Sequence, residues 1–421
     1  MAKTAFHLWS ADGSSLPLAL KLKGEGHLVT FSVHAKGGRS MGKGLVPIVA
    51  QPPKDSIVIF DCIGHAAEGT RYRALGHKVI GGNALEKTLE LDRPKGAALA
   101  RSLKMQVPPT FPFTSIPAAL TFLDKLTGDS EWFVKVSGDQ VESSTYNAPD
   151  VDSMLRYLDW IKNTQGPVDP FELQQAVEGV EVSCNGWFDG QQFVPPYDIT
   201  FENKHFLTGH KGPRTGCESC VVYHAQSHLL ANKTVALLVP TLADAKYVGP
   251  VDVNSMVDAG GTPQFLEFTA RLGFDSTQAW MRLFDDDLGE QLEAFVHGEL
   301  DTWDPTWTGL SSTLRVSIPP YPSGDEAEIG KTRGMPLGYD LLDEPFIDPI
   351  DVMEGPEVAG GSGIVCTVGA VGRTLDSLPK QLLARAEDLE IPNAQYRVDP
   401  LAGVQEDMTK LSKLKLLGYA P

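Results

Sequence analysis

Apolar residues in the first 90 positions follow two patterns, short continuous runs and helical spacing. The runs 4–9, 27–33 and 56–61 have the length of buried strands, and 15–24 has the spacing of a short helix. Strands that alternate with helices in this way are typical of a parallel sheet covered by helices. The sequence therefore predicts a parallel α/β unit at the start of the chain.

The pattern changes after Asp92, where longer helices alternate with strands and hairpins. Pro94 fits the first turn of a helix over 93–106, and Gly128 fits the end of a second over 115–128. Apolar runs, helical spacing and turn residues predict the elements that follow. They are a strand at 131–138, a helix at 151–163, a strand-turn-strand unit within 170–196, a hairpin over 248–270 and a helix over 277–300.

The last third begins with a stretch, 300–335, that is rich in Trp, Pro, Gly and Asp and is typical of a crossover into another unit. The patterns predict four elements that begin within or after this stretch: two strands, a helix with Pro379 in its first turn, and a short amphipathic helix. They cover 314–322, 360–371, 374–389 and 406–421.

Charge and hydropathy restrict the function classes. The chain carries 36 Lys and Arg against 54 Asp and Glu, a formal net charge of −18, whereas nucleic-acid-binding proteins usually present a basic face. We therefore expect no large nucleic-acid footprint. No apolar run approaches the ~20 residues that a membrane helix needs, and the N-terminus lacks the apolar segment of a secretory signal. We expect a cytoplasmic protein without membrane association.

The five cysteines do not indicate a disulfide framework, because their number is odd and they are sparse. Cys217 and Cys220 form a C-x-x-C motif, but a zinc ribbon needs a second pair. We interpret the two residues as ordinary strand or loop cysteines.

The segment 263–273, PQFLEFTARLG, raises the first chemical question, because a lone carboxylate, Glu267, follows the apolar pair Phe265-Leu266. An isolated carboxylate is costly to bury. Asp252 lies on the first strand of the same predicted hairpin, and antiparallel pairing can bring the two carboxylates to one face. Such a pair suits a hard cation, Mg²⁺ or Mn²⁺. The alternative is that both are solvated strand positions.

Two lysines lie where they could bind phosphate. Lys135 ends the apolar run WFVK, and Lys95 stands at the start of the preceding helix. Lysines on separate elements can hold nucleotide phosphates as point charges, although each alone is typical of an ordinary surface position.

The order of these motifs resembles that of the ATP-grasp ligases, and within them the phosphoribosylamine–glycine ligase family. The resemblance covers most of the chain and depends on the ordered set rather than on any one motif. The motifs are LELDRPKGAALARSLKMQVPPTFPF, EWFVKVSG, ELQQAVEGVEVS, GPRTG, GPVDVNSMVDAGGTPQFLEFTARLG, RVSIPPYP and GIVCTVGAVGRTLDSLPKQLLARAEDL.

The resemblance implies an ATP-grasp α/β fold in three parts. They are an N-terminal parallel α/β (pre-ATP-grasp) domain at 1–93, a nucleotide-binding ATP-grasp domain at 94–312 with a flap subdomain at about 108–170, and a small C-terminal α+β domain at 313–421.

The resemblance also implies roles for single residues. Lys95, Lys135 and Lys204 would bind the phosphates of ATP, the hinge residues Gln174, Gln175 and Val177 would bind adenine, and Glu181 would bind ribose. Asp252, Glu267 and Thr269 would hold the metal, and Arg271 with Lys135 would stabilise the reacting groups. Substrate contacts are expected from Gly13, Ser14, Arg214, Thr215, Asp275 and Ser276.

The implied chemistry needs no protein nucleophile. A substrate carboxylate attacks the γ-phosphate of ATP, and an amine then displaces phosphate from the acyl phosphate. Positioning and charge neutralisation by Mg²⁺, Lys and Arg are enough for both steps. The expected partners are an amino acid and an amine-bearing small molecule or nucleotide, and the expected state is a monomer or homodimer.

Three departures from the family pattern concern the phosphoribosyl site, the flap over the phosphates, and the metal and amino-acid sites. SADGSSL, 10–16, replaces the family's G-N-G-G-R-E-H, and SGDQVESSTYN, 137–147, replaces its Gly-rich flap. Thr269, Phe274 and Ser276 replace Asn, Asp and Glu. Three hypotheses follow: a ligase with altered substrates, a divergent phosphoribosylamine–glycine ligase of purine biosynthesis, and a nucleotide-binding protein with weak or no ligase activity.

Overall fold

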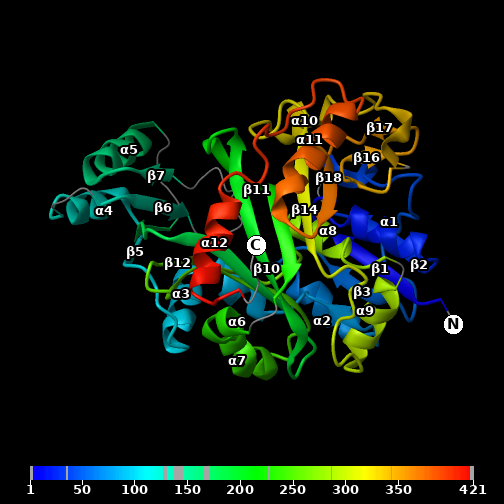
Figure 1. Ribbon diagram of the computed structural model, residues 1–421, viewed down its shortest axis with the longest axis horizontal. Helices are drawn as coiled ribbons and strands as arrows, with labels where there is room; N and C mark the ends of the chain where they lie inside the picture. The colour runs from blue at the N-terminus through cyan, green and yellow to red at the C-terminus, as the bar shows by residue number, and fades with distance from the viewer. Residues whose placement is uncertain are drawn as a thin grey trace.

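The structure is a computed structural model, and it arranges the chain around a large antiparallel sheet (Figure 1). A subdomain that contains α4, α5 and β5–β7 stands apart at the left of Figure 1, and the N-terminal and C-terminal parts lie together at the right. The residues described are 3–34, 37–126, 130–136, 146–164, 170–225, 228–285, 287–342 and 344–417.

The N-terminal part is the parallel α/β unit that the alternating runs predict. Its strands pair in the order β2-β1-β3-β4, all parallel, and α1 buries Leu18 and Leu22 in the same core as Phe6 and Leu8 of β1. Ligands of such sheets bind beyond the carboxyl ends of the strands. The elements are β1 (Ala5–Ser10), α1 (Leu16–Gly24), β2 (Leu28–Val33), η1 (Gly37–Ser40), β3 (Ile57–Phe60), α2 (Ala66–Ala74) and β4 (Val79–Ile80).

The flap subdomain has its own antiparallel sheet, in the order β5-β8-β6-β7, and its own core. Helices α4 and α5 bury Leu123 and Leu158 in that core. Because β8 belongs to this sheet, the sheet extends beyond 170. Its elements and those that lead into it are η2 (Lys87–Leu91), α3 (Arg93–Ser102), β5 (Thr110–Phe113), α4 (Ile116–Leu123), β6 (Trp132–Val136), β7 (Tyr146–Ala148), α5 (Val151–Thr164) and β8 (Phe171–Gln175).

The central sheet has the order β13-β12-β9-β10-β11-β14-β18-β15. The predicted hairpin over 248–270 is confirmed as β12 and β13, which form one edge. Strands from the predicted C-terminal domain extend the same sheet from the other side. The strands are β9 (Val180–Phe188), β10 (Phe193–Leu207), β11 (Lys211–His224), β12 (Gly249–Val257), β13 (Pro263–Thr269), β14 (Leu310–Ser317), β15 (Ile347–Pro349) and β18 (Ile364–Gly372).

The predicted single helix over 277–300 is wrong, because it is divided into α8 and α9. Phe284 lies between them and is buried against Trp280 and Trp303, so tertiary packing overrides helical continuity. The remaining elements are α6 (Leu229–Lys233), η4 (Val235–Leu238), α7 (Val239–Asp244), α8 (Ser276–Met281), α9 (Leu288–His297), α10 (Glu326–Gly330), η5 (Tyr339–Leu342), β16 (Val352–Met353), β17 (Glu357–Val358), η6 (Leu375–Ser377), α11 (Leu378–Asp388) and α12 (Val404–Lys413).

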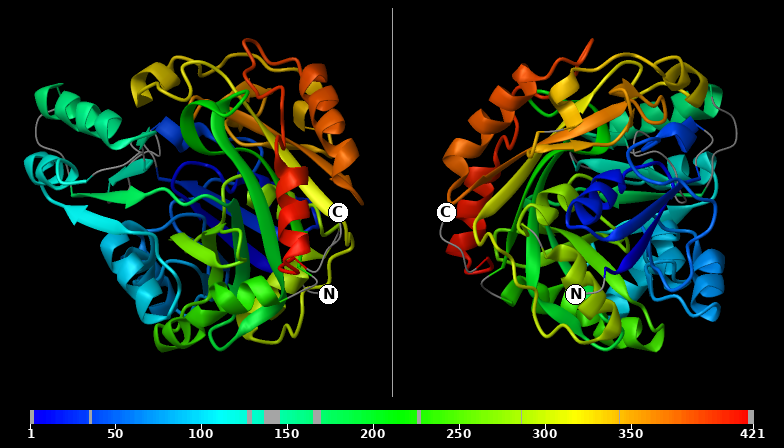
Figure 2. Two further views of the ribbon diagram at one scale, coloured as in Figure 1. Left: turned by 60° about the vertical axis from the view of Figure 1, so that its left-hand side comes forward. Right: turned by 90° about the vertical axis from the view of Figure 1, so that its right-hand side faces the viewer.

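One hydrophobic core joins the N-terminal part, the central sheet and the C-terminal helices, whereas the flap core is separate. Figure 2 shows the flap subdomain facing the rest of the molecule across an open side. A cleft of about 960 Å³ is lined by residues from the N-terminal part, α3, β8, the central sheet and the segment after β14. Among the helices described, none is long and apolar enough to cross a membrane.

Candidate active site

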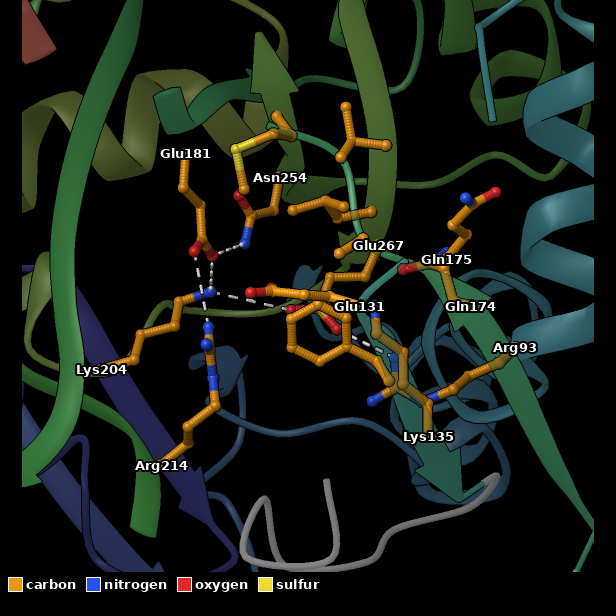
Figure 3. A pocket seen from close by; sticks show the side chains of 15 residues that line it. Arg93, Glu131, Lys135, Gln174, Gln175, Glu181, Lys204, Arg214, Asn254 and Glu267 are labelled. Atoms are coloured by element: carbon orange, nitrogen blue, oxygen red, sulfur yellow. Dashed lines mark hydrogen bonds and ion pairs between the residues drawn. The ribbon is translucent and has the colours of Figure 1, made fainter. Parts of the chain in front are cut away.

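A pocket of about 220 Å³ lies between the flap sheet and the central sheet (Figure 3). It shares Lys204, Glu267 and other residues with the larger cleft, so the two form one continuous site. The pocket has an apolar side, formed by Phe133, Met256 and Leu266, and a charged side. An apolar slot beside convergent charges is the usual form of a small-molecule site.

Acidic and basic side chains alternate on the charged side. Lys204 Nζ lies 2.8 Å from Glu181 Oε1, 3.5 Å from Glu202 Oε2 and 3.9 Å from Glu267 Oε1. Arg214 Nη2 is 3.4 Å from Glu181 Oε2, and Arg93 Nη1 is 3.0 Å from Glu267 Oε2. Figure 3 shows Glu181, Lys204, Arg214, Glu267 and Arg93 converging from β9, β10, β11, β13 and α3.

These contacts keep Glu181 and Glu267 ionised. Burial opposes ionisation of Glu267, but Arg93, Lys204 and Lys135 outweigh it and hold the pKa of this carboxyl well below its usual range. The pKa of Glu181 is likewise lowered, because Lys204 and Arg214 outweigh its burial. The cluster therefore carries fixed charges of both signs at neutral pH.

Lys135 projects from β6 into the same pocket. Burial lowers the pKa of its ammonium to about 8, against the attraction of Glu267, and the nearby Arg93 adds to the lowering. Lys135 is therefore a cation at neutral pH that loses its charge in mildly alkaline solution.

The structure does not bring Lys95 into the pocket, although the sequence led us to expect it there. Lys95 is two-thirds exposed and lies 2.7 Å from Asp92, the residue that caps α3. Arg93 lines the pocket instead. Because successive helical residues turn by about 100°, positions 93 and 95 lie on nearly opposite sides of α3, and one of them faces outward.

The three predicted hinge residues, Gln174, Gln175 and Val177, line the pocket. The Gln174 amide donates to Thr110 Oγ1 at 3.1 Å, and the Gln175 amide donates to Ser130 Oγ at 3.0 Å. These bonds fix the side chains against the flap sheet. Their role toward adenine stays a prediction.

The two carboxylates expected to bind the metal share one face of the hairpin but are not directly opposite each other. Asp252 pairs with Thr269, and Glu267 pairs with Asn254, so the two carboxylates are diagonal neighbours. Among the residues that the structure describes, no group of three or more His, Cys, Asp or Glu is placed to hold a metal.

The donors present nevertheless fit Mg²⁺ bound together with a nucleotide. Burial raises the pKa of Asp252 well above its usual value, and the negative charge of Glu202 raises it further. Asp252 Oδ1 lacks a hydrogen-bond partner within the described segments. Mg²⁺ commonly takes one or two carboxylates and completes its shell with phosphate and water. Asp252 and Glu267 could supply that share of the shell.

Arg271, Thr269 and Ser276 line the large cleft beyond the hairpin. Arg271 Nε donates to Glu90 Oε1 at 3.0 Å, and its guanidinium lies 4.2 Å from the centre of the Phe274 ring. Phe274 thus supports Arg271 through a cation–π contact. This contact gives a packing reason for Phe274, which replaces an Asp of the family pattern.

The expected substrate residues are divided between the cleft and the interior. Ser14, Arg214 and Thr215 line the cleft. Gly13 has a positive φ of 90° and packs against Met41, because an added Cβ would lie 2.4 Å from Met41 Sδ. Gly13 therefore shapes the loop and is not among the cleft-lining residues.

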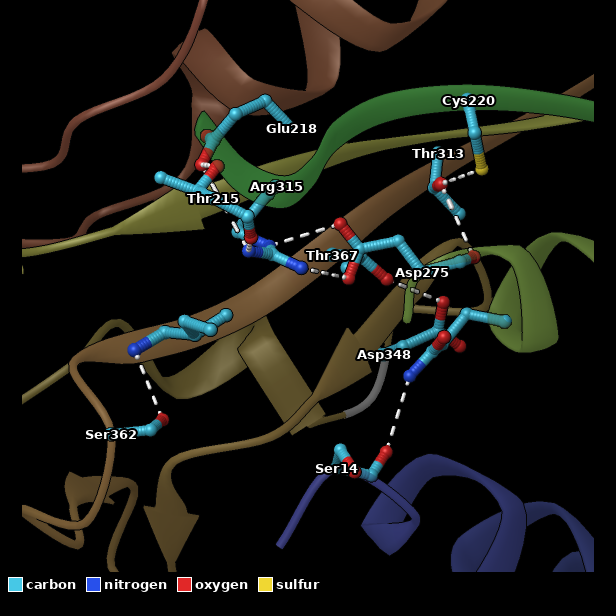
Figure 4. Close-up of polar contacts among 12 residues, drawn as sticks. Ser14, Thr215, Glu218, Cys220, Asp275, Thr313, Arg315, Asp348, Ser362 and Thr367 are labelled. Atoms are coloured by element: carbon cyan, nitrogen blue, oxygen red, sulfur yellow. Dashed lines mark hydrogen bonds and ion pairs between the residues drawn. The ribbon is translucent and has the colours of Figure 1, made fainter. Parts of the chain in front are cut away.

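Asp275 does not face the large cleft, in contrast to the expectation. Arg315 holds it by two hydrogen bonds of 2.9 Å, one from Nε and one from Nη2 (Figure 4). Arg315 Nη1 also donates to Tyr321 Oη at 2.8 Å and to the Thr215 carbonyl at 3.1 Å. Asp275 is a buried support for Arg315, which itself lines the cleft.

Sequence reasoning missed several lining residues, chiefly Arg93, Asn254, Glu202, Arg315 and Tyr321. A signal existed for Glu202 and Asn254, because each lies two residues from a predicted site residue and so shares its face of the strand. No comparable signal marked Arg315. The replaced flap, 137–147, lies outside the described residues apart from Tyr146 and Asn147.

Comparison with known proteins agrees with this geometry. No protein-family model matches the chain. Over 237 residues it is 26% identical to the phosphoribosylamine–glycine ligase of Ralstonia nicotianae, a match that covers 54% of this chain and 55% of that protein. The chain thus spans about half the length of the first curated relatives that it matches.

Solved structures match over more of the chain. The phosphoribosylamine–glycine ligase of Thermotoga maritima superposes with a TM-score of 0.72 at 17% identity, covering 94% of this chain and 100% of that chain. An L-amino acid ligase from Bacillus licheniformis gives 0.59 at 14% identity, with 92% and 98% covered. The chain has an ATP-grasp fold, and its predicted resemblance to ATP-grasp ligases is confirmed.

Proposed function

We propose that this protein is an ADP-forming ligase that joins the carboxylate of an amino acid to an amine carried by a small molecule or a nucleotide. The observation that supports this proposal most is the cluster of Lys204, Arg214, Arg93 and Lys135 around two ionised carboxylates beside an apolar slot. The fold and the relatives' printed names agree with it.

In this proposal the slot between Phe133, Met256 and Leu266 receives the adenine, and Gln174, Gln175 and Val177 border it. Glu181 receives the ribose. The cations then exchange part of their contacts with Glu181 and Glu267 for the phosphates of ATP. Because a lysine or arginine already held in place loses little freedom on binding, the preformed cluster favours phosphate recognition.

Asp252 and Glu267 would hold Mg²⁺, which would neutralise charge on the phosphates when bound. The substrate carboxylate then attacks the γ-phosphorus, the bond to the bridging oxygen breaks, and ADP leaves. The amine nitrogen attacks the acyl carbon, phosphate leaves, and the amine loses a proton. Arg271, held by Glu90 and Phe274, is placed in the cleft to stabilise the negative charge that develops on the acyl group.

The decisive test is mass spectrometry of reactions that contain the protein, ATP, Mg²⁺, pooled amino acids, and pooled amines or nucleotides. The proposal predicts ADP and a new amide that require one member of each pool. Tight ATP binding without ADP from any pair would instead favour a nucleotide-binding protein with weak or no ligase activity.

The printed activity of the relatives favours a second candidate, ligation of glycine to phosphoribosylamine. Growth of a purine-auxotrophic strain that carries this gene would support that candidate. Failure to restore growth, together with an amide product from other substrates, would support a ligase with altered substrates.

A further inference from the structure

The loop at the carboxyl end of β1 is closed on a buried carboxylate, Asp61, from the end of β3. Asp61 accepts hydrogen bonds from the backbone amides of Ala11 at 3.1 Å and Ser15 at 3.2 Å. The hydroxyls of Ser10, Ser14 and Ser15 also donate to it. Asp61 is only 3% exposed.

This arrangement fills the place where an external anion would bind. The loop leads into α1, a nine-residue helix, and free amides at such an N-terminus attract phosphate. Here the amides of Ala11 and Ser15 bind Asp61, that of Gly13 binds Ser10 Oγ, and that of Ser14 binds Asp12 Oδ1. A phosphate would have to displace a carboxylate of the protein itself.

A second loop, 360–363, closes in the same way at the C-terminal side of the cleft. The amides of Gly361, Ser362 and Gly363 donate to Asp351 at 2.8–3.0 Å, and Asp351 is completely buried. A run of successive amides of this kind can bind an anion. Here these amides are already bound to a carboxylate of the protein itself, that of Asp351.

Between the two loops lies a recess of about 30 Å³ that adjoins the large cleft, with which it shares Asp12, Ser14 and Arg315. Gln278 also lines it, is 3% exposed and donates from Nε2 to the Ser14 carbonyl at 3.2 Å. Gln278 Oε1 is buried and has no hydrogen-bond partner within the part of the chain described. A recess of this volume can hold one small polar group.

The charges around the recess favour a cation. Asp12 and Asp275 are the acidic residues that line it, and Ser14, Ser362 and Gln278 are its neutral polar residues. The guanidinium of Arg315 borders the same recess, but Asp275 already neutralises it through two hydrogen bonds. Among the described residues up to the end of β4 that line the cleft, none is Lys or Arg. A phosphate would meet Asp12 without a basic residue on that wall to compensate.

We infer that the acceptor substrate presents a positively charged, phosphate-free group, such as a second amino group, to the recess formed by Asp12, Ser14 and Gln278. The identification of this ligand as the acceptor rests on the proposed function. The binding of the ligand to the recess does not rest on the proposed function, because the recess exists in the chain without ATP. The carboxylate of Asp12 is then the hydrogen-bond acceptor for the ammonium group.

Calorimetric titration of the full chain without ATP tests the inference. The probes are 1,3-diaminopropane, 1,4-diaminobutane, O-phosphoethanolamine and inorganic phosphate. We expect saturable binding of a diamine and none of the phosphate compounds. Asp12→Asn should weaken diamine binding by about tenfold or more, since it removes a charge-assisted hydrogen bond. Asp244→Asn, an equal charge change on an exposed position of α7, should leave it within about twofold.

Asp12→Lys provides a second variant, which should abolish diamine binding and allow O-phosphoethanolamine to bind. Thermal unfolding of each variant verifies that it is folded. Tighter binding of the phosphate compounds to the unaltered chain would overturn the inference. Absence of diamine binding, or diamine binding that Asp12→Asn leaves unchanged, would overturn it equally.

The same probes distinguish this inference from the proposed function. Diamine binding without ADP formation in any amino acid pool would support the recess and contradict the ligase. ADP formation that requires a phosphorylated amine would support the ligase and contradict the recess.

Discussion

Two clusters of ion pairs meet at the cleft, and they differ in how far ligands can reach them. In the cluster around Lys204, about a third of the Glu181 and Glu267 side chains is exposed, at 30% and 33%. In the cluster around Arg315, the side chains of Arg315 and Asp275 are both 3% exposed. The first set of charges can exchange partners with a ligand, whereas the second is closed within the protein.

In the closed cluster, which is the one around Arg315, more of the hydrogen-bond partners come from within the protein. Arg315 donates to Asp275, Tyr321 and the Thr215 carbonyl, and burial raises the pKa of the nearby Glu218 to about 7. Buried ion pairs of this kind fix geometry, and breaking one leaves a charge without compensation. The open cluster, around Lys204, is therefore the candidate for phosphate chemistry. The closed cluster, around Arg315, fixes the positions of residues that border the cleft.

The largest expected effect is on stability, from Asp275→Asn. Removal of one partner from the buried pair should lower the free energy of unfolding by about 3–5 kcal/mol. Urea denaturation followed by circular dichroism measures this change. Glu406→Gln, which removes an exposed carboxylate from α12, is the control and should produce no measurable change. Equal stability of the two variants would contradict the distinction between the clusters.

Next in size is the loss of activity from Glu267→Gln. If Glu267 binds Mg²⁺ and orients Arg93 and Lys204, ADP formation should fall by about 100-fold or more. Its effect on stability should be smaller than that of Asp275→Asn, because the side chain borders solvent. The rate is measured by coupled ADP detection, with Glu290→Gln on the exposed face of α9 as control. An unchanged rate would refute the metal assignment.

A smaller effect distinguishes Arg93 from its neighbour Lys95. Arg93→Ala should weaken binding of a non-hydrolysable ATP analogue by about tenfold or more, as expected for a charged hydrogen bond. Lys95→Ala should change it less than about twofold, because Lys95 points to solvent. Calorimetry gives both values. The reverse order would mean that the sequence-based assignment of Lys95 was correct and that α3 rotates when nucleotide binds.

The smallest effect is the pH dependence that Lys135 confers. The pKa of its ammonium, about 8, is lowered in the free protein, so its charge is present below pH 8 and lost above it. Affinity for the ATP analogue should be constant from pH 6.5 to about 7.5 and fall by up to tenfold per unit above pH 8. Lys135→Arg should remove this decrease, since arginine stays charged. A decrease that persists in Lys135→Arg would assign it to another group.

Much of the fold was predictable, because local patterns were strong. Alternating apolar runs and helices in the first 90 residues indicated the parallel unit, and apolar runs with turn residues over 248–270 indicated the β12–β13 hairpin. The break between α8 and α9 was not predictable, since it depends on Phe284 packing against Trp303. Likewise, the extension of the central sheet by β14, β18 and β15 joins segments that are distant in sequence.

The sequence by itself indicated that Asp252 and Glu267 lie on the two strands of one hairpin and could share a face, because side chains alternate along a strand with a period of two. The pairing register, which only the structure shows, puts them on the same face. The sequence also put Lys135 at the end of an apolar strand, and the family resemblance pointed to the 174–177 hinge; the structure brings both to one pocket. Only the tertiary structure decided between Arg93 and Lys95, since the rotation of α3 about its axis is set by packing. Only the tertiary structure also showed that Asp61 and Asp351 occupy two loops suited to anions, because hydrogen bonds between distant segments leave no local pattern in the sequence.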